Sequence, residues 1–184
     1  MKATGIVRRI DDLGRVVIPK EIRRTMRIRE GDPLEIYTDR EGEVIFKKYS
    51  PIGELAAFAG EYAETLHKTC SLSVVICDRD AVIATAGVPR KEYGEKSVSE
   101  ALEKIIEGRS MYVWRDGMDR IPAIAEGGSH TVSCAMPILA EGDIVGCVVS
   151  LTTGDKNDKA MPASDVESKL IQTAAGFLGK QLES

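Results

Sequence analysis

Short stretches of apolar residues, each interrupted by turn-forming residues, dominate the first fifty positions of the chain. Apolar runs at residues 4–10 and 16–18 predict two strands, and Gly14 between them can supply the positive φ that a tight reversal needs. Pro19 ends the second strand and can open a helix, which we expect over residues 20–27.

Alternating apolar and polar positions predict a second pair of strands at residues 34–38 and 43–48, around a glycine-containing turn at residues 39–42. The result is a small unit of four strands and one helix. A unit of about 50 residues buries too small a fraction of its surface to be secure alone, and this one has no sequence signal for a metal or a disulfide. We therefore expect it to fold as a dimer.

A helix follows, with Ser50 placed to cap it and Pro51 to open it. Its apolar residues recur at intervals of three and four, at Ile52, Leu55, Ala59, Tyr62 and Leu66. This seam covers only two heptads, fewer than a coiled coil needs. It fits both packing on its own domain and pairing with the same helix of a second chain, and both interpretations stay open.

The remaining pattern is α+β. We expect, in order, strands at 73–77 and 81–85, a helix from 97 to 108, a hairpin of strands at 131–139 and 144–152, and a final helix from 164. Ser97 with Glu100 and Ser164 with Glu167 have the spacing of capping boxes, which predicts where the two later helices begin.

Charge is distributed unevenly between the two parts. Residues 1–48 contain twelve basic and nine acidic residues, a net charge of +3, whereas the remainder contains thirteen and twenty, a net charge of −7. A basic head on a chain that is acidic overall indicates a polyanionic partner for that head, although a charge run is as often a solvated face.

The basic residues of the first helix share one face. Lys20, Arg23, Arg24 and Arg27 follow the i, i+3, i+4, i+7 spacing, opposite the apolar side of the helix. Four like charges on one face repel one another and destabilise the helix. A phosphate backbone facing them would turn this repulsion into attraction.

The stretch TGIVRRIDDLGRVVIPKEIRRTMRIREGDPLEIYTDREGEVIFKKYSP, and GRVVIPKEIRR within it, resembles the swapped-hairpin DNA-binding domain of the AbrB transition-state regulators. The resemblance implies that residues 1–51 of two chains interleave into one small β-barrel that binds double-stranded DNA, in A·T-rich promoter regions. Arg8, Arg15, Arg23 and Arg24 stand at the matching positions, and Lys20 completes their helix face. It also implies a cytoplasmic regulator, in the forespore, that activates some late sporulation genes and represses others.

The residue types of this head suggest how it would read DNA. Residues 1–48 contain neither Asn nor Gln, the side chains best suited to bidentate contact with adenine. We expect phosphate contacts to position the dimer, and DNA shape or bendability to supply much of the specificity, helped by arginine contacts to guanine.

Residues 52–184, with a connecting helix at 52–66, resemble a GAF domain, in which a central antiparallel sheet with flanking helices senses small molecules. The resemblance places a pocket between the sheet and residues 108–130. Four apolar residues there are candidates for a ligand-binding lid, namely Met111, Tyr112, Trp114 and Ile121. The alternative is that these residues finish the core. A second interface through paired connecting helices would make the dimer a tetramer.

The sequence offers few residues for catalysis or for binding a metal or a cofactor. The four cysteines, Cys70, Cys77, Cys134 and Cys147, form no CxxC pair, and three lie in apolar strand-like runs. With only His67 and His130 besides, we expect no metal site, no cofactor and no catalytic residues. No run is apolar enough to span a membrane. Two alternative functions remain: an antitoxin, since related barrels occur in toxin–antitoxin pairs, and a methionine sulfoxide reductase, since some GAF-like domains use cysteines in that reaction.

Overall fold

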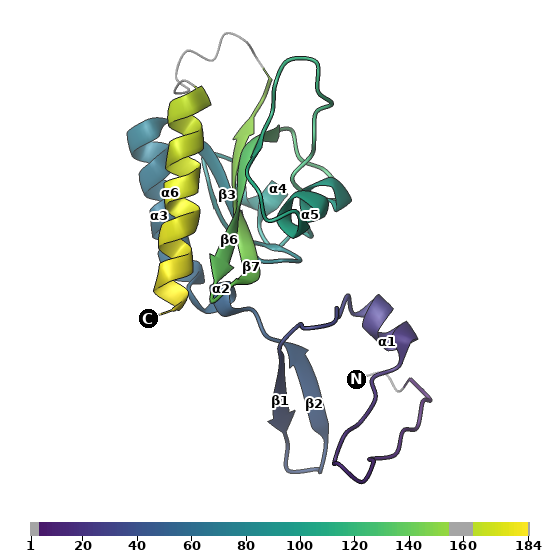
Figure 1. Cartoon of the computed structure of the whole chain (residues 1–184). Coiled ribbons are helices and arrows are strands. Elements are labelled where there is room, and N and C mark those ends of the chain that lie inside the picture. Colours follow the sequence, from purple (N-terminus) through teal and green to yellow (C-terminus); the bar gives the residue numbers. More distant parts are fainter. Residues whose placement is uncertain (1–3, 155–163, 184) are drawn as a thin grey trace. The chain divides into compact units, whose positions relative to one another are not determined.

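The structure is a computed structural model that describes residues 4–154 and 164–183. The chain divides into two compact units, Met1–Tyr49 and Ser50–Ser184, and the division falls two residues before the boundary expected from the sequence. Figure 1 shows the elements of both units, which are described separately below.

The first unit contains one short helix and one hairpin. Helix α1 spans Lys20–Thr25, and strands β1 (Leu34–Thr38) and β2 (Val44–Lys48) pair antiparallel. Asp39 closes the hairpin, because its Oδ1 accepts hydrogen bonds from the backbone N–H groups of Glu41 and Glu43 at 3.0 and 2.8 Å. The helix and hairpin expected from the sequence are present, although α1 ends two residues earlier than expected.

The two strands expected at residues 4–10 and 16–18 are not strands in this structure. The reversal between them does form, with Gly14 at φ +75° and the Asp11 N–H donating to the Arg15 carbonyl oxygen at 3.0 Å. A strand also needs a hydrogen-bonded neighbour along its length, and none of the described residues of this chain provides one. The apolar pattern of these segments predicts that they pair as strands, but the described residues of one chain contain no neighbouring strand for them.

Apolar side chains of the first unit are unusually exposed. Val7, Ile10 and Leu13 are 88%, 70% and 70% exposed, and the group of exposed large apolar residues also includes Ile6, Val16, Val17, Met26, Ile36, Tyr37, Val44 and Phe46. So many apolar residues on a unit of this size indicate a surface that associates with another protein surface.

The second unit is built on a five-stranded antiparallel sheet with the strand order β4-β3-β7-β6-β5. Its strands are β3 (Ser73–Cys77), β4 (Val82–Ala86), β5 (Tyr112–Val113), β6 (Thr131–Ala140) and β7 (Asp143–Thr152). The long β6–β7 hairpin turns through Glu141 and Gly142, both with positive φ, as a two-residue turn of the mirror-image type requires. All four longer strands match those expected from the sequence to within about two residues.

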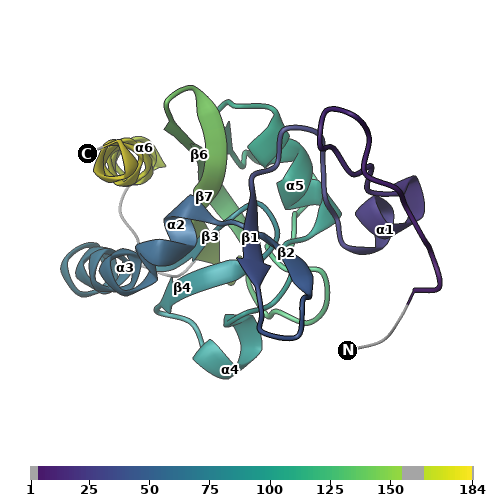
Figure 2. The ribbon, with the colours of Figure 1, turned by 90° about the horizontal axis from the view of Figure 1, so that it is seen from below.

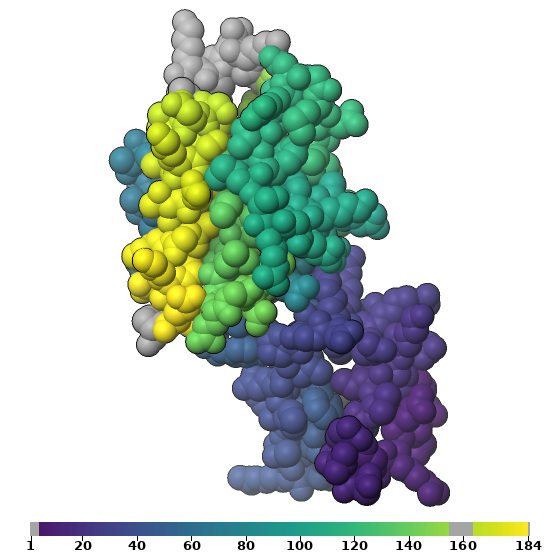
Figure 3. All heavy atoms as spheres, in the orientation of Figure 1, coloured from purple at the N-terminus to yellow at the C-terminus, as the bar shows by residue number. Residues whose placement is uncertain are grey.

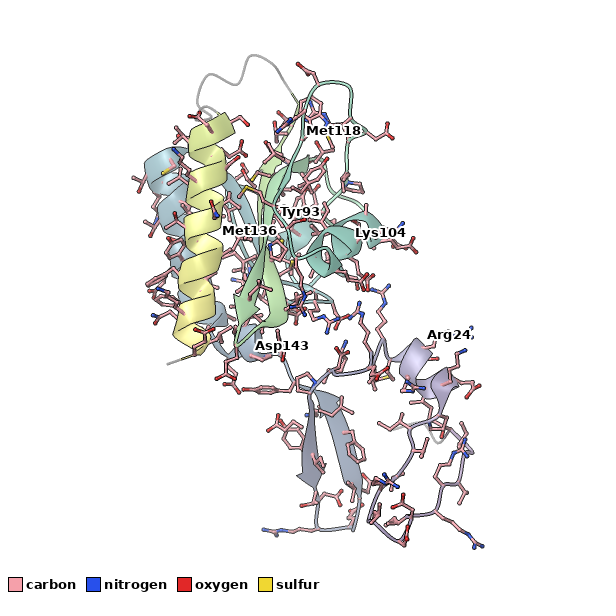
Figure 4. All side chains as sticks on the ribbon, in the orientation of Figure 1. Arg24, Tyr93, Lys104, Met118, Met136 and Asp143 are labelled. Atoms are coloured by element: carbon pink, nitrogen blue, oxygen red, sulfur yellow. The ribbon has the colours of Figure 1, made fainter. Side chains whose placement is uncertain are left out.

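Helices cover both faces of this sheet (Figure 2). Helices α2 (Pro51–Glu54), α3 (Ala56–Cys70) and α6 (Ser164–Leu182) pack on one face, and α4 (Arg90–Tyr93) and α5 (Glu100–Glu107) lie on the other. Each face has its own apolar core. Tyr93, fully buried and labelled in Figure 4, is the largest side chain of the α4/α5 core. This three-layer α+β arrangement is the one expected for residues 52–184.

The expected connecting helix is two helices, α2 and α3, separated at Leu55. Ser50 caps α2 as predicted, since its Oγ accepts a hydrogen bond from the Gly53 N–H at 3.2 Å. The apolar seam faces the sheet of its own unit, where Ile52 and Ala59 are completely buried. Packing within the unit therefore accounts for the seam, the first of the two alternatives.

The two predicted capping boxes are wrong in detail. Helix α5 is capped by Ser99, whose Oγ accepts from the Leu102 N–H at 3.0 Å, because Ser97 is used in a β-bridge to Ala81. Glu167 does not cap α6. Its side chain is buried against the sheet, where the Ser133 hydroxyl donates to it at 3.1 Å.

Helix α6 approaches the sheet very closely at Gly179. A Cβ atom at that position would lie 2.2 Å from the carbonyl oxygen of Leu139 in β6. Figure 3 shows α6 and the β6–β7 hairpin in direct contact. Glycine therefore sets the spacing between the last helix and the sheet.

Candidate nucleic-acid interface

The turn that carries Arg15 is organised by Asp11. The Asp11 carboxylate accepts from the backbone N–H of Leu13 at 3.0 Å and of Arg15 at 2.8 Å, and its Oδ2 pairs with Arg15 Nε at 2.8 Å. The Arg15 N–H and then its guanidinium hold the pKa of Asp11 below its usual range. The Arg15 side chain is nevertheless 69% exposed, so it remains accessible to a phosphate. Arg8 is exposed in the preceding segment.

Helix α1 presents the other predicted contacts. Lys20, Arg23 and Arg24 are all exposed, and Ile22 on the opposite side is half-buried. Figure 4 shows Arg24 projecting outward from α1. Arg23 and Arg24 lie in the last turn, where positive charge is favourable beside the helix carbonyl groups. All five predicted DNA contacts, Arg8, Arg15, Lys20, Arg23 and Arg24, are thus exposed basic residues of one unit.

Arg27 departs from the helical stripe expected from the sequence. The helix ends in a Schellman motif, in which the Ile28 N–H donates to the Arg23 carbonyl oxygen at 2.7 Å and the Arg27 N–H donates to that of Arg24 at 3.3 Å. This motif requires a left-handed residue at Arg27, where φ is +51°. Glycine is the usual residue at this position of the motif. Because Arg27 is not a glycine, nothing in the sequence indicated that the helix ends before this residue.

Lys48, at the end of β2, fixes the end of α1. Its Nζ donates to the carbonyl oxygen of Arg27 at 2.8 Å and lies 3.5 Å from the carboxylate of Asp32. Asp32, whose side chain is only 4% exposed, also accepts from the Arg29 N–H at 2.8 Å. The hairpin therefore holds the basic helix in place through these contacts. This role of Lys48 and Asp32 was not predicted from the sequence. Besides each other, they bind backbone groups of Arg27 and Arg29, which follow a helix end that was not expected.

The four residues of the candidate lid in the second unit lie in two kinds of environment. Met111 packs against the α3/α6 core, and Tyr112 and Ile121 pack against the α4/α5 core. Trp114 lies under the guanidinium of Arg120, 3.5 Å from the ring centroid, and its Nε1 donates to the Met118 carbonyl oxygen at 3.0 Å. The contacts of Met111, Tyr112 and Ile121 support the alternative that the segment finishes the core, whereas those of Trp114 lie within the segment itself. A lid function for these four residues stays a prediction.

The cysteines are placed as small apolar residues. Cys77, Cys134 and Cys147 are completely buried, and burial raises the pKa of the Cys134 thiol to about 11 and that of Cys147 well above its usual value. Cys70 is partly exposed at the end of α3. Over residues 4–154 and 164–183, no three His, Cys, Asp or Glu side chains gather as metal ligands, and no helix is long and apolar enough to cross a bilayer.

Comparisons with known proteins identify both parts of the chain. Residues 54–183 match the family described as stage V sporulation protein T C-terminal, transcription factor. Residues 7–53 match the MazE family of antitoxins, described as antidote-toxin recognition. The whole chain is 55% identical to stage V sporulation protein T of Bacillus subtilis, covering 100% of this chain and 99% of the relative. The chain belongs to the stage V sporulation protein T family.

Membership in this family confirms the expected class of protein, a transcription regulator with an AbrB-type head. The transition state regulatory protein AbrB of Bacillus subtilis is 43% identical over 101 residues, which cover 54% of this chain and 88% of that protein. The MazE match covers only the head, whereas the residues behind it belong to the transcription-factor family and form a folded unit. The antitoxin alternative therefore lacks support from most of the chain.

A solved free methionine-R-sulfoxide reductase from Thermoplasma acidophilum has a fold similar to the second unit. Its TM-score is 0.52 at 10% identity, and the match covers 71% of this chain and 94% of the reductase. Identity this low shows the fold alone, a central antiparallel sheet with flanking helices, as expected from the sequence. Because the stage V sporulation protein T family is a family of transcription factors, this chain is a regulator and not an enzyme.

Proposed function

We propose that two copies of this chain combine their first units into one β-barrel that binds double-stranded DNA through Arg8, Arg15, Lys20, Arg23 and Arg24. The observation that carries the proposal is the presence of two different surfaces on one small unit. One surface is apolar and exposed, as at Val7 and Ile10, and the other is basic and exposed on α1.

The apolar surface supports the dimer. The segments around Val7 and Val17 have strand-forming sequences but form no strand in the described chain, and β1 and β2 form a sheet of only two strands. A two-stranded hairpin is marginal by itself, and additional strands from a second chain would both pair these backbones and bury the apolar residues. In the interleaved barrel implied by the AbrB resemblance, each chain supplies the neighbouring strands and the apolar contacts that the other chain does not contain.

The basic surface supports DNA as the partner. Arginine forms bidentate contacts with phosphate, and exposed arginine and lysine side chains release counterions from the duplex when they bind. Since residues 1–48 contain no Asn or Gln, they lack the side chains best suited to direct hydrogen bonds with A·T base pairs. We infer that the head prefers A·T-rich promoter regions for their groove shape and deformability.

The finer assignments follow from the family. We propose that the protein acts in the cytoplasm of the forespore, where it activates some late sporulation genes and represses others. The second unit would join two dimers into a tetramer and respond to a small molecule held near residues 108–130. In support of a sensory role, this unit has the central antiparallel sheet and flanking helices that the GAF resemblance implies, with an apolar core on each face of the sheet.

Binding to an A·T-rich promoter fragment over a salt series tests the DNA site. The variant Arg23→Ala, Arg24→Ala should bind more weakly and reduce the slope of log affinity against log salt by about 0.9 for each phosphate that is no longer neutralised. The control Lys104→Ala, Lys180→Ala removes two exposed charges from helices of the second unit, α5 and α6. It should leave the slope unchanged. Equal slopes for the parent and the arginine variant would contradict the proposal.

A further inference from the structure

A groove of about 800 Å³ runs along one edge of the sheet in the second unit. Helix α3 forms one wall through Ala56, Ala57 and Gly60, and α4 forms the other through Arg90 and Lys91. Figure 2 shows β4, the last strand on this side of the sheet, between these two helices. All of its lining residues belong to the second unit, and none of them belongs to the candidate lid.

The floor of the groove is the backbone of β4 and not one face of it. Residues 81–85 all line the groove, although successive side chains of a strand point to opposite sides. Part of this edge is already occupied, since the Val82 N–H donates to the Lys96 carbonyl oxygen at 2.9 Å and the Glu95 N–H donates to that of Val82 at 3.2 Å. Beyond Val82, no backbone group of the described chain pairs with the outer edge of β4. An open edge of this kind can accept a further strand.

The walls leave room for that strand. Three of the five α3 residues that line the groove, Ala56, Ala57 and Gly60, have little or no side chain, and a Cβ atom at Gly60 would have no neighbour within 4 Å. Small residues on a helix that faces a sheet edge keep the space beside the edge open.

Charge differs between the two walls. Glu61 and Glu64 belong to α3, whereas Arg90 and Lys91 belong to α4, and these side chains are exposed. Glu64 is held by Lys68 at 2.7 Å, so Glu61 is the more available carboxylate of its wall. Glu95 also lines the groove, where the chain leaves α4. The α3 wall is therefore acidic and the α4 wall is basic apart from Glu95.

We propose that this groove binds an extended segment of a partner protein, which adds to β4 as a further strand and carries positive and negative side chains at alternate positions. Alternate residues of an added strand point to opposite faces of the sheet. The residues on the α3 side then face Glu61, and those between them face Arg90 and Lys91. Backbone hydrogen bonds to the β4 edge hold the segment, and the two walls select its charge pattern. The site would give this DNA-binding protein a protein partner.

A synthetic peptide tests the proposal on the full-length chain. The probe is a blocked eight-residue peptide of alternating lysine and glutamate, with binding measured by calorimetry. A control peptide repeats Lys-Lys-Glu-Glu, which has the same composition but places both charges on both faces. It should bind about fivefold more weakly, because surface ion pairs contribute modestly. Two further controls carry N-methyl groups, one on every lysine and the other on every glutamate. Because the N–H groups of only one of these sets face β4, one of the two peptides should bind at least about tenfold more weakly.

Variants locate the site. Gly60→Leu places a side chain in the groove, starting from a Cβ atom that has nothing within 4 Å, and should abolish binding. Gly176→Leu makes the same change at an equally open helical position on α6, away from the groove, and should bind as the parent does. Glu61→Lys and Lys91→Glu should each weaken binding of the alternating peptide. The double variant should recover it, because a slip of one residue exchanges the faces of the peptide.

Four outcomes would overturn the proposal. Binding of both N-methylated peptides as tightly as the unmodified peptide would show that no strand is added. Equal effects of Gly60→Leu and Gly176→Leu would show that the peptide binds elsewhere. Self-association of the chain that Gly60→Leu abolishes and the peptide does not compete with would show that a second copy fills the groove. Competition by free lysine or glutamate would show a small-molecule site in its place.

Discussion

The side chain of Lys48 donates a hydrogen bond to the backbone carbonyl oxygen of Arg27 at 2.8 Å. It thereby joins the last residue of β2 to the left-handed residue that ends the basic helix α1. The same ammonium group lies 3.5 Å from the largely buried carboxylate of Asp32. The position of α1 relative to the hairpin thus depends on one lysine.

Lys48→Met should loosen the end of α1. The substitution keeps most of the apolar length of the side chain but removes the hydrogen bond to Arg27 and the ammonium group beside Asp32. Loss of a charged hydrogen bond at a partly buried site should cost about 2–3 kcal/mol locally. Hydrogen exchange of the Ile28 amide should accelerate accordingly. The control Lys47→Met removes instead the ammonium group 4.6 Å from the Tyr37 ring centroid, and exchange of the Ile28 amide should change little.

Arg27→Gly should stabilise the head, and the loss of one positive charge near α1 should weaken its binding to DNA slightly although Arg27 is not one of the proposed contacts. The left-handed conformation at φ +51° is unfavourable for arginine and free for glycine, so the net gain should be about 0.5–1 kcal/mol after the greater flexibility of unfolded glycine is subtracted. Ser71→Gly, at the left-handed cap of α3, offers a matched control. It should stabilise the second unit by a similar amount and leave DNA affinity unchanged. Thermal unfolding and DNA titration of both variants measure these effects, and destabilisation by Arg27→Gly would contradict the motif.

Gly179→Ala should destabilise the second unit, because the added Cβ would lie 2.2 Å from the Leu139 carbonyl oxygen. Separating α6 from β6 should cost about 1–3 kcal/mol. Gly176→Ala, on the same helix with nothing within 4 Å of its Cβ, should instead stabilise α6 by about 1 kcal/mol. Urea unfolding followed through Trp114, the only tryptophan, compares the two variants. Equal effects of both substitutions would show that α6 is not closely packed.

Thiol reagents should distinguish Cys70 from the three buried cysteines. Native protein at neutral pH should be labelled at Cys70, and Cys134 should react only on unfolding, because burial raises its pKa to about 11 from 9.0. The neutral thiol is the form that folding favours. This contribution of Cys134 to stability is complete below pH 9 and is lost as the pH rises through about 11. Rapid labelling of Cys134 in the native protein at pH 7 would contradict this placement.

Local patterns were sufficient for most of the second unit. Apolar runs and glycine turns predicted β3, β6 and β7 because these strands are buried within one chain, where pattern and pairing agree. The caps were less predictable. Ser97 and Ser99 are two residues apart, and the choice between them depends on a bridge from Ser97 to Ala81 that no local pattern reveals.

The exposure of the candidate DNA-binding residues on α1 was predictable from the sequence, but the contacts that hold α1 in place were not. Spacing on a helix showed that Lys20, Arg23 and Arg24 share one face, and the structure leaves all three exposed. The contact between Lys48 and Arg27 joins residues 21 positions apart through a backbone group, so no side-chain pattern could predict it. The strands expected at residues 4–10 and 16–18 depend on partners that one chain does not contain.

The exposed apolar surface of the first unit makes the DNA-binding activity of this protein depend on its concentration in the cell. If the DNA-binding head requires two chains, its abundance at low expression rises with the square of the chain concentration by mass action. A twofold change in synthesis would then change the number of competent heads about fourfold. Heads that remain single would expose Val7 and Ile10 to chaperones and proteases. Transcription from promoters that this regulator binds would therefore change more steeply with the concentration of the chain than it would if a single chain bound DNA.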